Sequence, residues 1–287
     1  MSKLGELVLR NVWHLYRRWS PPPPASARND SREAYIRWQF ETSEGLFGMY
    51  PNFDIQGKSV LEIGCGTGGR AAWLATGGAA LVVAIDINAH EIETAREMCP
   101  KLFPEIQGKV EYLASEEGDL LPLGEFDVVL LVDAMEHVVS PPAMMRLAHH
   151  YTAPGGKFYF SVLGWFHHSG SHMGILPFAN VFFSDETLLN FTRWKVSRPG
   201  YKLGLFDSVP PTKRWEGLYD LRDRPDEHLN KITVREIKRL VKYSIFSQTT
   251  MTVCGFRHGP ARWFNPLRHV PVLQEMFHSY VVVECRK

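Results

Sequence analysis

The sequence is short of cysteine, has almost no net charge and contains no long hydrophobic run. Its four cysteines lie far apart, without a CxxC pair, which argues against a disulfide scaffold or a zinc ribbon and fits a reducing compartment. The 32 basic residues nearly balance 31 acidic ones. The basic excess that is typical of nucleic-acid binders is therefore missing, and we expect no nucleic-acid partner.

No apolar run approaches the roughly 18 residues that a membrane-spanning helix needs. The N-terminus also lacks the uninterrupted apolar stretch of a signal peptide, because Glu6, Arg10 and Arg17 break it. Hydrophobic residues make up 45% of the 287 residues and charged residues 22%, as in ordinary globular proteins, which excludes a disordered or fibrous chain. We expect a cytoplasmic protein.

Two helices are predicted before the first strand. Apolar residues recur at helical spacing from Leu4 to Trp19 and again from about Ser31 to Met49, and the four prolines from Pro21 to Pro24 favour a stiff spacer between them. The first helix carries two tryptophans and four basic residues against one acid, which suits contact with an anionic membrane. The same stripe also suits a helix packed on the domain, over the cofactor cleft or at a dimer contact. The oligomeric state is left open.

From about residue 59, short apolar strands alternate with helical stretches, which is typical of a parallel sheet covered on both faces. We predict an α/β fold: a doubly wound, Rossmann-like sheet of about seven strands with an N-terminal helical lid, its last strand an antiparallel hairpin partner. The predicted strands are Ser59–Ile63, Leu81–Ile85, Val110–Leu113, Phe126–Val132, Lys157–Val162, Thr249–Phe256 and Tyr280–Glu284. The predicted helices between them are Arg70–Thr76, Ala89–Met98, Ala143–Tyr151 and Thr233–Ile245.

The strand and helix periodicity fails after the fifth strand. Residues 164–231 are rich in aromatics, His, Gly and Pro, with one clear helix at Asp185–Trp194. Because a structureless loop of this length is unusual, we expect a substrate cap with a fold of its own. The chain then divides into N-terminal helices and linker (1–55), a cofactor-binding core (56–163), the cap (164–231) and the elements that complete the sheet (232–287).

A glycine-rich turn follows the first strand of the core. Gly64, Gly66 and Gly69 match the GxGxxG pattern, and Asp86 ends the next strand about 20 residues later. Such a turn presents backbone N–H groups and a helix N-terminus to a ligand, while the carboxylate can accept hydrogen bonds from ribose hydroxyls. The pattern predicts a nucleoside-containing cofactor at the carboxyl ends of the first strands.

Five motifs in order extend this pattern over about residues 56 to 163. They are Val60-Leu-Glu-Ile-Gly-Cys-Gly-Thr-Gly68, Ala84-Ile-Asp86, Glu125-Phe-Asp-Val-Val129, Glu136-His137-Val138 and Ala153-Pro-Gly-Gly-Lys157. In these motifs the chain resembles the class I S-adenosylmethionine-dependent methyltransferases, and most closely the ubiquinone- and menaquinone-type branch. The resemblance implies methyl transfer from S-adenosylmethionine to an O, N or C nucleophile of a small-molecule or lipid-like acceptor. The rival hypotheses are a non-catalytic S-adenosylmethionine-binding protein and, more remotely, a nucleotide-dependent oxidoreductase.

The resemblance also assigns residues to the cofactor. Glu62 is implied to hold the turn and the amino group, Asp86 the ribose hydroxyls, and Ile87 to lie against the adenine. Glu116 is the choice for the adenine amino group, with Asp119 as its alternative, because the family's usual Gly-Asp-Ala stretch is replaced here. The full implied set is Glu62, Gly64, Cys65, Gly66, Gly68, Asp86, Ile87, Glu116, Glu117 and Val132.

Glu136 and His137 are the candidate catalytic residues, since they follow the fourth strand where the transferred methyl group is expected. A histidine there can act as a general base, because its unperturbed pKa is near neutrality. The spacing Asp133-x-x-Glu136-His137 also resembles a divalent-metal grouping of some quinone-pathway relatives, and both residues could simply cap and orient the next helix. All three interpretations stay open, and no metal is assigned.

Three histidines of the cap, His167, His168 and His172, are the candidate substrate contacts. Histidines at this spacing can bind zinc, but no Cys or acidic partner is close in the sequence. A plain polar loop is the third interpretation. The aromatic residues around them would line an apolar acceptor pocket or form the core of the cap.

Overall fold

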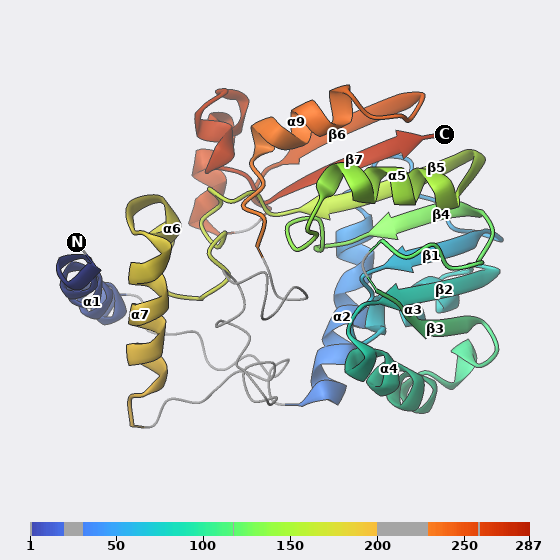
Figure 1. The fold of residues 1–287 in the computed structure, drawn as a ribbon, viewed down its shortest axis with the longest axis horizontal. Helices are drawn as coiled ribbons and strands as arrows, with labels where there is room; N and C mark the ends of the chain where they lie inside the picture. Colours follow the sequence, from blue (N-terminus) through green and yellow to red (C-terminus); the bar gives the residue numbers. More distant parts are fainter. Residues whose placement is uncertain (1, 20–30, 117, 200–228, 258) are drawn as a thin grey trace.

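A single mixed sheet organises the protein (Figure 1). The structure, a computed structural model, describes residues 2–19, 31–116, 118–199, 229–257 and 259–287. The strand order is β3-β2-β1-β4-β5-β7-β6; β1 to β5 run parallel, and β7 is antiparallel to both β5 and β6. The strands are β1 (Ser59–Ile63), β2 (Leu81–Asp86), β3 (Val110–Ala114), β4 (Phe126–Leu131), β5 (Thr152–Val162), β6 (Gln248–Cys254) and β7 (Tyr280–Arg286). The predicted fold class is confirmed.

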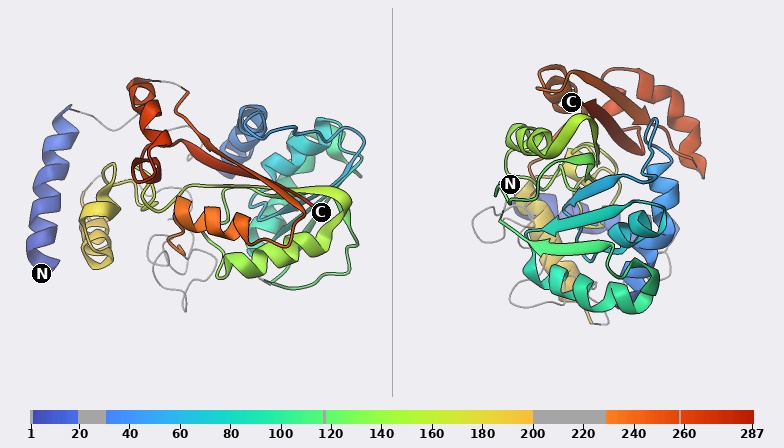
Figure 2. Two further views of the ribbon diagram at one scale, coloured as in Figure 1. Left: turned by 90° about the horizontal axis from the view of Figure 1, so that it is seen from above. Right: turned by 90° about the vertical axis from the view of Figure 1, so that its right-hand side faces the viewer.

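Helices cover both faces of this sheet (Figure 2). The helices α2, α3 and α4 pack on one face, and α5 and α9 on the other. The helices are α1 (Ser2–Trp19), α2 (Arg32–Phe47), α3 (Gly69–Thr76), α4 (Ala89–Leu102), α5 (Pro141–Tyr151), α6 (Ala179–Phe182), α7 (Asp185–Val196) and α9 (Val234–Lys242). Short 3-10 helices are η2 (Pro104–Ile106), η5 (Pro260–His269) and η6 (Leu273–Glu275).

The two-sided burial explains why the strands are apolar throughout. In β1, Val60 faces the core under α2, α3 and α4, while Leu61 and Ile63 face the core under α5 and α9. Alternate residues of a strand point to opposite faces, so a strand between two helical layers has no solvent face on which to place polar residues.

Local signals predicted the helix starts better than the helix ends. Asn88 caps α4 and Ser184 caps α7 through their side-chain oxygens, as expected. The helix α4 continues past its predicted end at Met98 to Leu102, with Pro100 inside it. The helix α5 begins at Pro141, two residues before its predicted start, because proline is tolerated in the first turn of a helix. The strand β5 begins earlier than predicted, at Thr152, and its pairing with β4 is interrupted by a register shift around Gly155.

The cap has a small hydrophobic core of its own, which α1 helps to close. Leu9 of α1 is fully buried with Phe191 and Leu188 of α7, and Trp13 packs edge-on against Phe191 and Trp194. The N-terminal helix is thus packed on the cap and not over the glycine turn. Within the described part of the chain, no helix is long and apolar enough to cross a bilayer.

The helix α2 touches the start of α3 very closely, and this contact can be tested. At Gly69 a Cβ atom would lie 2.4 Å from the carbonyl oxygen of Ile36, so Gly69→Ala should lower the free energy of unfolding by about 1–3 kcal/mol through overpacking. Gly45, also on α2, has nothing within 4 Å of such a Cβ, so Gly45→Ala should stabilise the protein by about 1 kcal/mol. Urea unfolding measures both, and equal effects would contradict the close packing.

Candidate active site

The glycine turn after β1 is held by the end of β2. The backbone N–H groups of Gly64 and Cys65 donate to the carbonyl oxygen of Ile85 over 2.8 and 3.1 Å. The N–H of Gly66 donates to Oδ2 of Asp86 over 2.7 Å, and Oδ1 of Asp86 accepts from the N–H of Asn88 over 2.8 Å. One carboxylate therefore joins the turn to the start of α4.

The turn has the backbone shape of a ligand cradle. Gly66 has a φ of +55°, and a Cβ there would meet nothing within 4 Å, so this glycine is required by its backbone conformation and leaves open space above it. Gly68 has a φ of +79°, and a Cβ there would lie 2.5 Å from the ring of Tyr112. The turn is thus packed from below by Tyr112 and open at Gly66.

Glu62 is a buried acid directly before the turn. Its side chain is almost fully buried, and its Oε2 atom has no hydrogen-bond partner among the described residues. Burial raises the pKa of Glu62 to about 8, against the lowering effect of Arg70, and Asp86 raises it further. A buried carboxyl with an unused oxygen beside an open glycine turn fits a cationic ligand group such as the amino group of S-adenosylmethionine.

Two further residues reach the turn, and the sequence analysis missed both. Gln39 of α2 is buried, and its Oε1 accepts hydrogen bonds from the Thr67 hydroxyl over 2.7 Å and from the Gly69 N–H over 3.3 Å. Arg70 of α3 forms a salt bridge of 2.9 Å with Asp133, just after β4. Nothing in the sequence marked Gln39 as a site residue, because a glutamine within an amphipathic helix is usually expected on the solvent face.

On the adenine side, the structure brings the predicted segment beside Asp86. Ile87 is partly exposed, which fits an apolar surface for a base. The N–H of Ser115 donates to the carbonyl oxygen of Asp86, and Glu116 and Asp119 close a turn by bonding each other's N–H groups. Both acids are exposed, so the choice between them stays a prediction. Glu117 lies outside the described residues.

The segment after β4 carries the candidate catalytic residues on a tight turn. Val132, directly after β4, is buried, and the N–H of His137 donates to the carbonyl oxygen of Ala134 over 2.9 Å. Asn230, near the end of the cap, holds this turn through three hydrogen bonds. Its side chain donates to the carbonyl oxygens of Met135 and Val138, and its N–H donates to that of Glu136.

The acid-x-x-acid-His grouping is divided in space. Asp133 has a φ of +53° and turns toward Arg70 and the hydroxyl of Ser161, which donates to its Oδ1 over 3.1 Å. Glu136 and His137 instead meet His172 of the cap. The His172 Nε2 atom lies 3.9 Å from Oε1 of Glu136, and the imidazoles of His137 and His172 are 5.1 Å apart.

These three side chains form the candidate catalytic group. One ligand atom from each of Glu136, His137 and His172 lies within 4.8 Å of the others, which is close enough to hold a cation. One carboxylate oxygen and two imidazoles suit a divalent transition metal or a proton relay. The metal interpretation of the grouping therefore keeps Glu136 and His137 but gains His172 in place of Asp133.

The other two predicted cap histidines lie elsewhere. His167 is buried, its ring 5.1 Å from that of His278, and burial together with the neighbouring histidines lowers its pKa to about 2. His168 is half-buried between the rings of Phe178 and Phe256, and burial lowers its pKa. Both are neutral at physiological pH.

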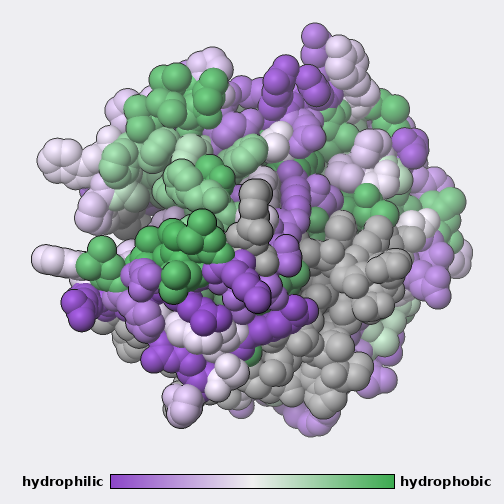
Figure 3. All heavy atoms as spheres, turned by 60° about the vertical axis from the view of Figure 1, so that its left-hand side comes forward, coloured by the Kyte–Doolittle hydropathy of each residue, from purple (hydrophilic) through white to green (hydrophobic). Residues whose placement is uncertain are grey.

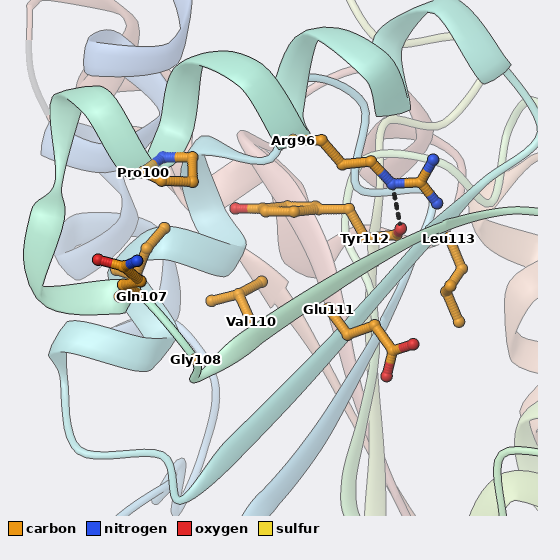
Figure 4. Close-up of a pocket in the computed structure, with 9 residues that line it drawn as sticks. Arg96, Pro100, Gln107, Gly108, Val110, Glu111, Tyr112 and Leu113 are labelled. Carbon is orange, nitrogen blue, oxygen red and sulfur yellow. Dashed lines mark hydrogen bonds between the residues drawn. The ribbon is translucent and has the colours of Figure 1, made fainter.

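A cavity of about 330 Å³ lies away from these residues, at the edge strand β3 (Figure 4). Its lining side chains come from β3, the end of α4 and the segment around Gly108, and Arg96 bonds the carbonyl oxygen of Tyr112 across it. None of the predicted cofactor or catalytic residues lines this cavity, and we assign it no part in the site.

Known relatives share the core of the chain. Ubiquinone biosynthesis O-methyltransferase from Neisseria meningitidis is 37% identical over 114 residues, covering 38% of this chain and 46% of that protein. The enzyme of the same name from Aromatoleum aromaticum is 35% identical over 152 residues, covering 49% of this chain and 62% of that protein. The chain thus spans about half the length of the curated relatives it matches.

Solved structures support the same fold. An S-adenosylmethionine-dependent methyltransferase from Mesorhizobium loti aligns over 91% of this chain and 100% of its own, with a TM-score of 0.50 and 18% identity. Phosphoethanolamine N-methyltransferase 1 of Haemonchus contortus, in complex with phosphoethanolamine and S-adenosylhomocysteine, aligns over 100% of this chain and 50% of its own, with a TM-score of 0.51 and 13% identity.

The family model of a methyltransferase domain matches residues 46–244, which is more than half of the chain. The chain belongs to the methyltransferase domain family.

Proposed function

We propose that the protein transfers the methyl group of S-adenosylmethionine to a nucleophilic O, N or C atom of a small-molecule or lipid-like acceptor. The observation that carries the proposal is the turn at Gly66, open above and held by Asp86, with the unsatisfied carboxyl of Glu62 beside it. The cofactor supplies an activated methyl group on a sulfonium ion, so the protein has to bind it, align the acceptor and exclude water.

The residues around the turn have separate tasks in this proposal. Glu62 would bind the cofactor's amino group, and Asp86 the ribose hydroxyls. Ile87 would pack on the adenine, with Glu116 at its amino group. The oxygen-methylating relatives favour an oxygen nucleophile, such as the hydroxyl of a quinone-type ring.

His137 would remove the proton from this nucleophile, with Glu136 and His172 around it. A neutral imidazole accepts the proton, and the carboxyl of Glu136 can stabilise the imidazolium that results. A second candidate, favoured by the convergence of Glu136, His137 and His172, is a divalent cation that these residues hold for the acceptor oxygen. The intact turn and the family match weigh against a non-catalytic binder and an oxidoreductase.

For partners, we propose peripheral contact with an anionic membrane through α1, which would place the protein at the inner face of a cytoplasmic membrane. While Leu9 faces α7, a second apolar row on α1 is open to solvent. It comprises Leu4, Leu7, Val8, Val12, Leu15 and Trp19. Four basic residues against one acid complement anionic headgroups. Cutting α1 away would uncover the cap core, so point substitutions on the outer row are the better probe.

Asp86→Ala should weaken S-adenosylmethionine binding about tenfold or more, because hydrogen bonds to a charged group contribute about 1.5–3 kcal/mol each. Asp127 is the matched control: this carboxylate accepts from the N–H and hydroxyl of Ser59 at the opposite end of β1. Asp127→Ala should leave the affinity unchanged. Calorimetry on folded variants decides, and full affinity in Asp86→Ala would remove the cofactor assignment.

At pH 7 the binding of S-adenosylmethionine should release a proton from Glu62. Its pKa of about 8 in the free protein lies above the 4.5 of an unperturbed Glu, so the group is protonated and has to ionise to bind an ammonium. The observed binding enthalpy should then depend on the ionisation enthalpy of the buffer, and Glu62→Gln should abolish this dependence. The same shift means that the free protein loses stability as pH rises from about 4.5 to about 8.

His137→Ala should lower turnover about a hundredfold or more while S-adenosylmethionine affinity is retained, because a general base contributes at least that factor. His150→Ala, on the exposed face of α5, is the control and should be neutral. Unchanged turnover over the whole pH range would return His137 to a structural role. Inactivation by a chelator that a divalent transition metal reverses would favour the cation.

A further inference from the structure

The connection between β6 and β7 presents large apolar side chains to solvent. It contains η5, in which no residue is buried, and η6. Trp263 is 85% exposed and Val272 is 76% exposed, and Phe264 and Val270 are also open. A contiguous apolar surface on a soluble protein commonly marks an interaction site.

These side chains are held outward by a built scaffold. The side chain of Asn265 accepts from the N–H of Phe256 over 2.7 Å and donates to its carbonyl oxygen over 3.0 Å, which ties η5 to the start of the connection. Phe264 stacks on Phe277, and Phe277 contacts Phe178 of the cap. The outward position of Trp263 and Val272 is therefore part of the fold of this connection.

The connection is also strongly basic. Between Cys254 and Gln274 the chain has three arginines, Arg257, Arg262 and Arg268, and no acidic residue, in a protein whose total charge is only +1. Arg262 is exposed next to Trp263, while Arg257 and Arg268 also donate to the carbonyl oxygens of Gly45 and Asn265. An exposed arginine beside a tryptophan matches the headgroup region of an anionic bilayer, where the ring sits at the interface and the guanidinium group meets phosphates.

The topology places this surface at the acceptor side of the site. Because β6 and β7 are antiparallel, their connection lies where β5 ends at Val162, which is the carboxyl edge that carries the glycine turn and the cap. The outer row of α1 lies at the same end of the molecule, and Figure 3 shows hydrophobic side chains gathered in two groups on this face.

We propose that residues 259–273 dock on an anionic lipid surface, as a second contact beside α1, so that the membrane meets the cap side of the site. The inference rests on the proposed function in one respect: a membrane contact brings the site to its acceptor only if that acceptor is lipid-like. A second copy of the chain is the less favoured occupant, since a two-fold contact would bring the arginine-rich surface against itself.

Co-sedimentation of the full chain with vesicles tests the proposal. The protein should pellet with equimolar phosphatidylglycerol and phosphatidylcholine, not with phosphatidylcholine alone, and high salt should release it. Trp263→Ser with Val272→Ser should weaken partitioning about tenfold or more. The matched control is Tyr243→Ser with Ile245→Ser. These two exposed residues lie between α9 and the start of β6, at the end of β6 away from the connection, and their replacement should leave vesicle binding unchanged. Leu7→Ser with Leu15→Ser reports the α1 contact separately.

Each remaining outcome is decisive. The proposal is wrong if the unaltered chain does not pellet, or if it pellets equally with neutral vesicles. It is also wrong if the Trp263/Val272 variant and the Tyr243/Ile245 control lose binding equally. A dimer that light scattering shows to break in the Trp263/Val272 variant would identify a second copy of the chain as the occupant instead. Arg262→Gln, which leaves the apolar residues in place, should also weaken binding to anionic vesicles; an unchanged affinity would overturn the charge argument. Calorimetry with S-adenosylmethionine on the same samples separates this proposal from the methyltransferase proposal, because either can fail while the other stands.

Discussion

The rest of the site depends on the hydrogen bond from Gly66 to the carboxylate of Asp86. It joins the turn after β1 to the end of the neighbouring strand, and the second oxygen of the same carboxylate accepts from the N–H of Asn88 at the start of α4. Parallel strands end at a common edge, so one short side chain can hold a turn and a helix start together. The geometry required by a nucleoside cofactor is thereby present in the free protein, which lowers the entropy lost on binding.

A row of buried charges continues from this turn toward the catalytic group. Glu62, Arg70 and Asp133 follow one another across the ends of β1 and β4, and Arg70 lies between the two acids. Burying a charge is costly unless it is paired, and here Asp133 takes the salt bridge while Glu62 keeps an unused oxygen. Burial raises the pKa of Glu62, so its carboxyl is protonated in the free protein, and in the proposed function the cofactor's amino group supplies the positive charge that pairs with its ionised form.

The sequence predicted those parts of the fold and the site that follow from local patterns. Continuous apolar strands indicated the two-sided sheet, and the glycines with Asp86 indicated the turn, because spacing along a strand-turn-helix unit determines what meets there. The contacts between the cap and the turn after β4 could not be predicted from the sequence. Asp133 points away from Glu136 and His137, because its left-handed backbone conformation turns its side chain toward Arg70. His172 and Asn230, by contrast, contact the turn that carries Glu136 although they lie 35 or more residues further along the chain. The sequence of the cap has no periodic pattern from which contacts between residues so far apart in the chain could be predicted.

The N-terminal helix shows how one amphipathic pattern can serve two surfaces. Leu9 and Trp13 are committed to the cap core, yet the outer row of α1 is as apolar as the inner one. A helix that is hydrophobic on more than one side needs more than one apolar neighbour, and the cap supplies only the first. Arg10 lies over the ring of Trp194 and Arg17 over the ring of Trp13, on the cap side of the helix, whereas Lys3 and Arg18 are exposed. Exposed basic side chains beside an apolar row suit a lipid interface, where they reach the phosphates. The contacts of α1 with the cap therefore define its inner face, and its exposed apolar row with Lys3 and Arg18 is the face for which we propose a lipid partner.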